Sequence, residues 1–157
     1  MIELDAIRDT YLTLRDCFTV TSLLVSKSTK GSTFHETIFL GQSPEEAKRR
    51  LAMAKTELDD WAIVALVSIF ERILFDHPKS PLRSKTARER ARGLDKAIEH
   101  FEPRVSSTVF EDVKRLRQYR HWVAHGKRWV ERPVSADPIS SYQRLVDFLG
   151  QAGLGAK

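Results

Sequence analysis

Two histidines and an arginine lie within six residues in the last third of the chain, at Arg120, His121 and His125. On a helix, residues four apart share a face, so we expect His121 and His125 to lie side by side, with Arg120 close enough to converge on the same cleft. Histidine exchanges protons near neutral pH, and arginine keeps its charge while bonding two phosphate oxygens.

These side chains suit RNA cleavage without a metal ion. The reaction needs a base for the 2′-hydroxyl, an acid for the leaving 5′-oxygen and a fixed cation beside the phosphorane. We expect His125 to act as acid or base and Arg120 to stabilise the phosphorane. The negative end of the helix dipole, at the C-terminus, favours a protonated imidazole, which suits His125 as a proton donor. One Arg and one His make a small site, so a homodimer with two facing motifs is the expected arrangement.

The positive charge of the chain is concentrated around this motif. The formal net charge is +5, and the segment from Arg83 to Arg132 holds 14 basic and 7 acidic residues, whereas the rest holds 12 basic and 14 acidic ones. A basic segment is typical of a protein that binds a polyanion, although solvated basic faces are common on helical proteins. The candidate RNA-binding residues are those nearest the motif, Arg117, Lys127, Arg128 and Arg132.

The window Arg120-His121-Trp122-Val123-Ala124-His125-Gly126 resembles the R-x4-6-H motif of the HEPN superfamily, in which a polar residue often follows the arginine. The resemblance implies an α-helical bundle that dimerises with its two motifs facing each other and cleaves RNA without a metal. The expected products of this cleavage are a 2′,3′-cyclic phosphate and a 5′-hydroxyl. It further implies Arg120 and His125 as the catalytic pair, His121 as the polar neighbour, and a role as a toxin with a cognate antitoxin or as a component of antiviral defence.

One position departs from a subset of that superfamily. HEPN toxins paired with nucleotidyltransferase antitoxins usually have a tyrosine two residues after the histidine, where this chain has Lys127. Because some HEPN domains have lost catalysis, the alternative function is an inactive module that binds RNA or a partner protein.

Other interpretations of the same residues stay open. His121 and His125 have the spacing of two zinc ligands, but the residue after His121 is Trp122 rather than the glutamate of a zinc protease, so we expect no metal and no cofactor. We expect Trp122 to pack in the core rather than to stack on bases. Glu71 is either a buried acid that orients Arg120 or His125, or a structural partner for Arg72 or another cation.

Composition fits one soluble domain. The chain has 157 residues, of which 41% are hydrophobic and 30% charged, and we interpret residues 1–157 as a single HEPN-like domain. The longest apolar run, Trp61 to Phe70, is about half of the roughly 20 residues that span a bilayer, so no membrane association is expected. Cys17 can form no internal disulfide, and no secretory signal is evident, which predicts a cytoplasmic protein with an inert core thiol at Cys17.

The apolar periodicity predicts an all-α fold, a bundle of about five helices. Ser43-Pro44 with Glu46 marks the start of a long helix, which we expect other helices to surround from Trp61 onward. Gly126 is placed to end the fourth helix, and Asp137-Pro138 to begin the last. The predicted helices cover residues 2–27, 44 to about 77, 82–101 and 138 to about 149, and the fourth in chain order follows Ser106 and Ser107, has apolar positions from Val109 to Val123 and ends before Gly126.

Two segments lack a clear helical pattern. Gly31 to Ser43 contains apolar residues between two glycines, which fits either a long loop or a short β-hairpin. The glycine-containing segment from about residue 150 onward predicts a frayed C-terminal tail.

Overall fold

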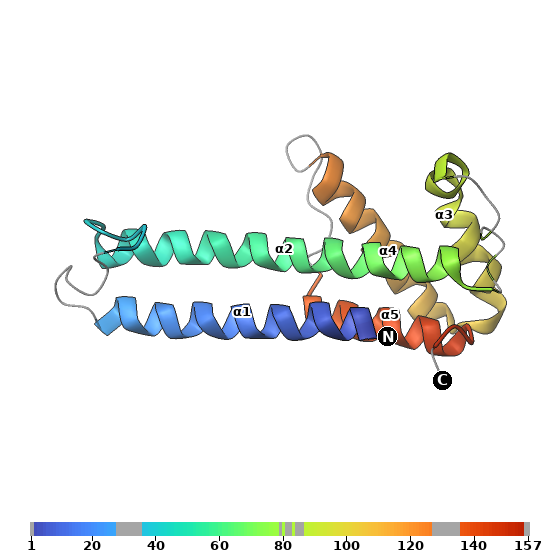
Figure 1. Ribbon diagram of the computed structural model, residues 1–157, viewed down its shortest axis with the longest axis horizontal. Helices are drawn as coiled ribbons and strands as arrows, with labels where there is room; N and C mark the ends of the chain where they lie inside the picture. Colours follow the sequence, from blue (N-terminus) through green and yellow to red (C-terminus); the bar gives the residue numbers. More distant parts are fainter. Residues whose placement is uncertain are drawn as a thin grey trace. The chain divides into compact units, whose positions relative to one another are not determined.

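The computed structural model describes residues 2–27, 36–78, 80, 83, 87–126 and 136–155, with the side chains of 87–92 excepted. These residues form an all-α structure, as the sequence predicts. Five α-helices and one 3-10 helix are present in the described ranges (Figure 1). The helices are α1 (Ile2–Lys27), α2 (Pro44–Asp76), α3 (Ala87–Phe101), η2 (Glu102–Arg104), α4 (Ser107–His125) and α5 (Pro138–Gln151).

The start of α2 is a capping box, as the sequence predicts. The backbone N–H of Glu46 donates to the Ser43 hydroxyl at 3.2 Å, and the backbone N–H of Ser43 donates to the Glu46 carboxylate at 2.8 Å. This hydrogen bond from the Ser43 backbone is the main reason why the pKa of Glu46 is lowered. Two backbone N–H donors at the N-terminal end of α2 are therefore satisfied by side chains.

The chain divides into two compact units, and the division falls within α1 and α2. Unit 1 consists of Met1–Arg8 and Asp60–Lys157, and unit 2 consists of Asp9–Asp59. Unit 1 holds the main hydrophobic core, in which the ring of Phe148 on α5 meets Phe70 on α2 edge-on at 5.3 Å and Phe101 on α3 at 6.5 Å between centroids. Edge-to-face aromatic contacts at such distances stabilise a core beyond the area they bury.

Helix α4 packs into unit 1 through one apolar stripe. Its buried residues are Val109, Phe110, Val113, Leu116 and Tyr119, which recur at helical spacing. The hydroxyl of Tyr119 donates to the buried Asp60 carboxylate on α2, which fixes the last turns of α4 against α2. Trp122 packs partly buried against the same core, as predicted.

Unit 2 is a helical hairpin in which residues 9–27 of α1 and 44–59 of α2 lie side by side and run in opposite directions (Figure 1). The Tyr11 hydroxyl donates to Asp59 at 2.8 Å across the hairpin. Its core is small, with three buried residues supported by two partly buried phenylalanines: Val25, Ala47 and Leu51, with Phe18 and Phe39.

The segment before α2 contains turns and no strand over residues 36–43, and the rest of the Gly31 to Ser43 segment lies outside the described residues. Gly41 has φ +76°, a left-handed conformation that suits glycine. The described part is therefore a turn and not the β-hairpin that the sequence left open.

One expectation about burial is met except at its first residue, and another is wrong. From Ala62 to Phe70 no residue of α2 is exposed, as expected, but Trp61, where we expected the burial to begin, is 48% exposed. Cys17 is exposed rather than buried in the core. In both cases an apolar residue type lies on the outer side of its helix, which its type alone cannot reveal.

The C-terminal segment differs from the expected frayed tail as far as residue 155. Ala152 is 1% exposed and Leu154 is 4% exposed. The N–H of Leu154 donates to the Leu149 carbonyl at 2.8 Å, and Gly153 takes φ +69°. This glycine-dependent ending closes α5 and folds Leu154 back onto the core.

Across the described residues, none of the helices combines the length and the apolar character needed to cross a membrane.

Glu3 and Arg72 form an ion pair that links α1 to α2 within unit 1.

We predict that Ser43→Ala lowers the free energy of unfolding by about 1 kcal/mol, because the capping box loses its hydroxyl. Urea unfolding followed by circular dichroism measures this change. Ser106→Ala is the matched control, because Ser106 also caps a helix, α4, but its side chain makes no capping hydrogen bond. Equal losses in the two variants would contradict the prediction.

Candidate functional site at the end of α4

The last two turns of α4 carry the motif arginine and both histidines. Buried residues up to Tyr119 fix this part of the helix, and Gly126 follows its last residue, as predicted, with its N–H donating to the Trp122 carbonyl at 2.9 Å. The polar residues of the motif therefore project from a helix that is held on its apolar side.

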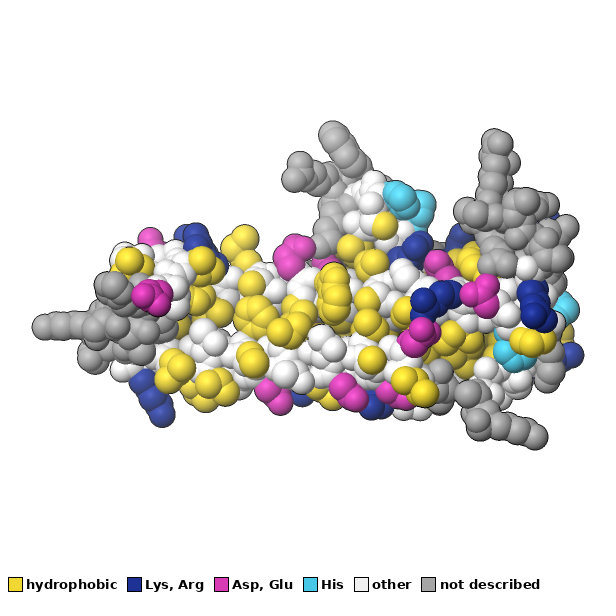
Figure 2. Space-filling model, viewed as in Figure 1, with side chains coloured by type: hydrophobic (Ala, Val, Ile, Leu, Met, Phe, Trp, Pro, Cys, Tyr) yellow, Lys and Arg dark blue, Asp and Glu magenta, His cyan; other side chains and the backbone are white. Residues whose placement is uncertain are grey.

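His121 and His125 lie together on the surface. Their ring centroids are 4.8 Å apart, with the ring planes inclined by 49°, and both residues are exposed. Histidine side chains are visible on the surface over the C-terminal end of α4 (Figure 2). This pairing confirms the expectation from their four-residue spacing.

Arg120 is directed toward α2. Its Nε donates to the Ser68 hydroxyl at 3.4 Å, and its Nη2 lies 3.4 Å from Oε2 of Glu71. The Ser68 hydroxyl donates in turn to the Val64 carbonyl at 2.7 Å, which leaves its lone pairs to accept from Arg120. Ser68 and Glu71 are three residues apart on α2 and hold the guanidinium from one helical face.

The structure therefore brings together two of the three residues that the sequence placed in one cleft. Arg120 and His125 are five positions apart, which on an α-helix separates them by roughly 140° around the axis. The described contacts of Arg120 are with α2, and the described ring contact of His125 is with His121.

Glu71 is a poorly solvated carboxylate that contacts the motif arginine. Its side chain is 13% exposed, and its Oε1 atom is buried with no hydrogen-bond partner among the described residues. Burial raises the pKa of Glu71, while the charges of Arg120 and Arg117 oppose that rise. Loss of solvation thus outweighs the attraction of two guanidinium groups.

Of the two roles left open for Glu71, pairing with Arg72 is wrong. Glu71 contacts Arg120, and Arg72 contacts Glu3.

Sequence reasoning passed over Ser68, the second group that holds Arg120. The available signal was a lone hydroxyl inside the apolar run Trp61 to Phe70, one helical turn before Glu71.

The other candidate RNA-binding residues divide into two groups. Arg117 lies one turn before Arg120 and forms an ion pair with Asp95 on α3. Lys127, Arg128 and Arg132 lie outside the described residues. No group of three His, Cys, Asp or Glu side chains in the described ranges could hold a metal ion.

Comparison of the chain with protein-family models, with curated proteins and with solved structures found no match.

We predict that Glu71→Gln changes the pH dependence of stability. A carboxyl group with a raised pKa destabilises the folded protein above that pKa, and this penalty disappears as the pH falls through it. The stability of the Gln variant relative to the wild type should therefore be greatest near neutral pH and decline toward acid pH.

Unfolding free energies measured by urea titration between neutral and acid pH test this prediction. Glu99→Gln, on the exposed surface of α3, provides the matched control for replacing a glutamate. A stability difference between Glu71→Gln and the wild type that stays constant over the range would contradict the prediction.

Proposed function

We propose that this chain is a metal-independent endoribonuclease of the HEPN type, with Arg120 and His125 as its catalytic pair. The observation that carries the proposal is the exposed His121–His125 pair, one residue beyond an arginine that two α2 side chains hold in place. The group types match the needs of the reaction, which are proton transfer and a fixed cation.

In the proposed reaction, the 2′-oxygen of the RNA attacks the adjacent phosphorus while an imidazole accepts its proton. The bond from phosphorus to the 5′-oxygen breaks, and the leaving oxygen takes a proton from a second imidazole or the same one. The products are a 2′,3′-cyclic phosphate and a 5′-hydroxyl. His125 is the principal acid or base, and His121 is its neighbour on the same face of α4.

Arg120 stabilises the charge of the phosphorane. A guanidinium has five N–H donors, and the contacts of Arg120 with Ser68 and Glu71 occupy two of its three nitrogens. Its side chain is 31% exposed, so the remaining donors are within reach of a phosphate. A rigid arginine loses less entropy when it binds the substrate than a freely moving one.

A homodimer completes this proposal. Arg120 and His125 lie on different sides of α4, so a phosphate that contacts both is best served by two copies, with the arginine from one and the histidine from the other. A two-fold axis near the α4 helices would create two such sites. The cellular role that goes with this activity is that of a toxin with an antitoxin partner, or of a defence component.

A second candidate function is a catalytically inactive module that binds RNA or a protein. The observation that favours it is the contact of Arg120 with the poorly solvated Glu71 carboxylate, because an arginine needed to pair a buried acid has a structural reason to be present. The inactive module and the enzyme differ in whether RNA is cleaved.

We predict that the purified protein cleaves single-stranded or transfer RNA in the presence of EDTA, and that Arg120→Ala and His125→Ala each lower the rate by about a hundredfold or more. Products with a cyclic phosphate end, detected by resistance to direct 3′-end ligation, identify the chemistry. Lys114→Ala on the same helix is the control for removing a cation away from the motif.

Circular dichroism must show that the variants are folded. RNA cleavage that survives both substitutions at the wild-type rate would refute the catalytic assignment. Binding of RNA without cleavage by the wild type would favour the inactive module.

We further predict that replacing Lys127, Arg128 and Arg132 together by alanine weakens RNA binding and flattens its salt dependence. Each side chain that no longer neutralises a phosphate of single-stranded RNA reduces the slope of log K against log salt by about 0.7. Filter binding of the His125→Ala variant at several salt concentrations, with and without the three substitutions, measures this slope. An unchanged slope would remove these residues from the RNA interface.

A further inference from the structure

Unit 2 leaves much of its apolar surface uncovered. Among the described residues of unit 2, three form the buried core cluster and Tyr11 is buried as well, whereas several large apolar side chains are between 39% and 68% exposed. Hydrophobic side chains are visible along the surface of α1 and α2 in this part of the chain (Figure 2). A helix with an apolar stripe is stable when another element covers it, and a two-helix hairpin offers each helix one neighbour. The exposed residues are Leu14, Val20, Leu23, Leu24, Ile38, Leu40 and Met53.

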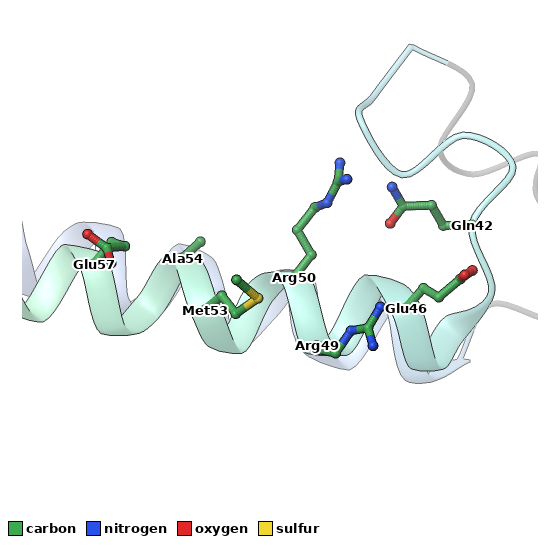
Figure 3. Close-up of a pocket in the computed structure, with 7 residues that line it drawn as sticks. All are labelled: Gln42, Glu46, Arg49, Arg50, Met53, Ala54 and Glu57. Atoms are coloured by element: carbon green, nitrogen blue, oxygen red, sulfur yellow. The ribbon is translucent and has the colours of Figure 1, made fainter. Parts of the chain in front are cut away.

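One face of α2 in this unit forms a shallow pocket. Met53, which is 66% exposed, and Ala54 lie at its middle, and charged residues lie on both sides of them (Figure 3). Arg50 precedes Met53 by three residues, and Glu57 follows Ala54 by three. The complete lining is Gln42, Glu46, Arg49, Arg50, Met53, Ala54 and Glu57.

The charges on this face are self-complementary. When two identical helices pack in opposite directions about the midpoint between Met53 and Ala54, each Arg50 lies opposite the other copy's Glu57. Arg50 and Glu57 are seven residues apart, so they lie within roughly 20° of each other around the helix. A two-fold axis repeats this pairing, which gives two oppositely charged contacts around an apolar centre.

We infer that this face of α2, formed by Arg50, Met53, Ala54 and Glu57, binds the same face of a second copy of this chain in antiparallel orientation. We assign a second copy as the occupant because a two-fold rotation brings the basic end of this face onto the acidic end of the same face in the other copy. An isologous interface requires this kind of self-match. The face lies in unit 2, whereas Arg120 and His125 lie in unit 1. The inference therefore does not rest on the proposed ribonuclease activity.

Opposite charges set the register of the two helices. Like charges brought together across an interface oppose association strongly, whereas opposite charges permit it. The two-fold axis doubles the effect of each substitution, since one changed residue occurs in both copies. A charge reversal at Arg50 or at Glu57 should therefore weaken self-association much more than a reversal elsewhere on α2.

The experiment measures the mass of the full-length protein in solution by sedimentation equilibrium, for the wild type, Arg50→Glu and Glu57→Arg. The proposed pairing near α4 involves neither residue, so it would give each variant at most the mass of one pair. We expect the association of each variant through α2 to be at least about tenfold weaker than that of the wild type. An equimolar mixture of the two variants should regain the wild-type association. In a mixed pair the new glutamate of one variant faces the new arginine of the other, and the unchanged Glu57 of the first faces the unchanged Arg50 of the second.

Lys55→Glu is the matched control. Lys55 is exposed on the same helix and lies roughly 160° around it from Glu57, and its replacement changes the net charge by the same amount as Arg50→Glu. We expect this variant to associate like the wild type. Circular dichroism confirms that all the variants are folded.

The inference is overturned if either single variant associates as strongly as the wild type, if the mixture associates no better than its components, or if the wild type is monomeric. A weak association of Lys55→Glu equal to that of Arg50→Glu would also overturn it, because the effect would then follow net charge. His125→Ala should self-associate like the wild type, so a failed ribonuclease assignment and a failed interface give different results.

Discussion

The contact between Arg120 and Glu71 sets what the end of α4 can do. Glu71 has lost most of its solvent, and the guanidinium at 3.4 Å is the nearest positive charge that compensates it. In the proposed function, the same guanidinium also binds a phosphate. Protein stability and the proposed anion binding would then depend on one side chain, and a ligand of Arg120 would compete with the Glu71 carboxylate. Ser68 also contacts the guanidinium, through a neutral hydroxyl at 3.4 Å.

Local sequence signals predicted the helices well. The Ser43-Pro44 start of α2, the Asp137-Pro138 start of α5 and the end of α4 before Gly126 all depend on residues within one helical turn, and the structure shows each of them. The Asp137 side chain accepts from the Ser140 N–H at 2.7 Å, as its position before proline predicts. The side-by-side histidines followed equally directly from their spacing.

Features that depend on distant parts of the chain were harder to predict. The direction of Arg120 is set by Ser68 and Glu71, which lie about fifty residues away on another helix. Exposure of Trp61 and Cys17, and burial of Leu154, likewise depend on which neighbours the fold supplies and not on residue type. A motif in one sequence therefore gives the chemistry available at a site, whereas the groups that restrain it come from tertiary packing.

The small core of unit 2 has a consequence for how the protein unfolds. Free energies of local opening follow the apolar surface that an opening exposes, and residues 9–59 bury far fewer large side chains than the core around Phe70 and Phe148. Among the described helices, we therefore expect the two in this hairpin to open most often under native conditions. Their amide hydrogens should then exchange with solvent sooner than those of α4 and α5, and proteases should cut there before they cut the end of α4, which carries the histidines.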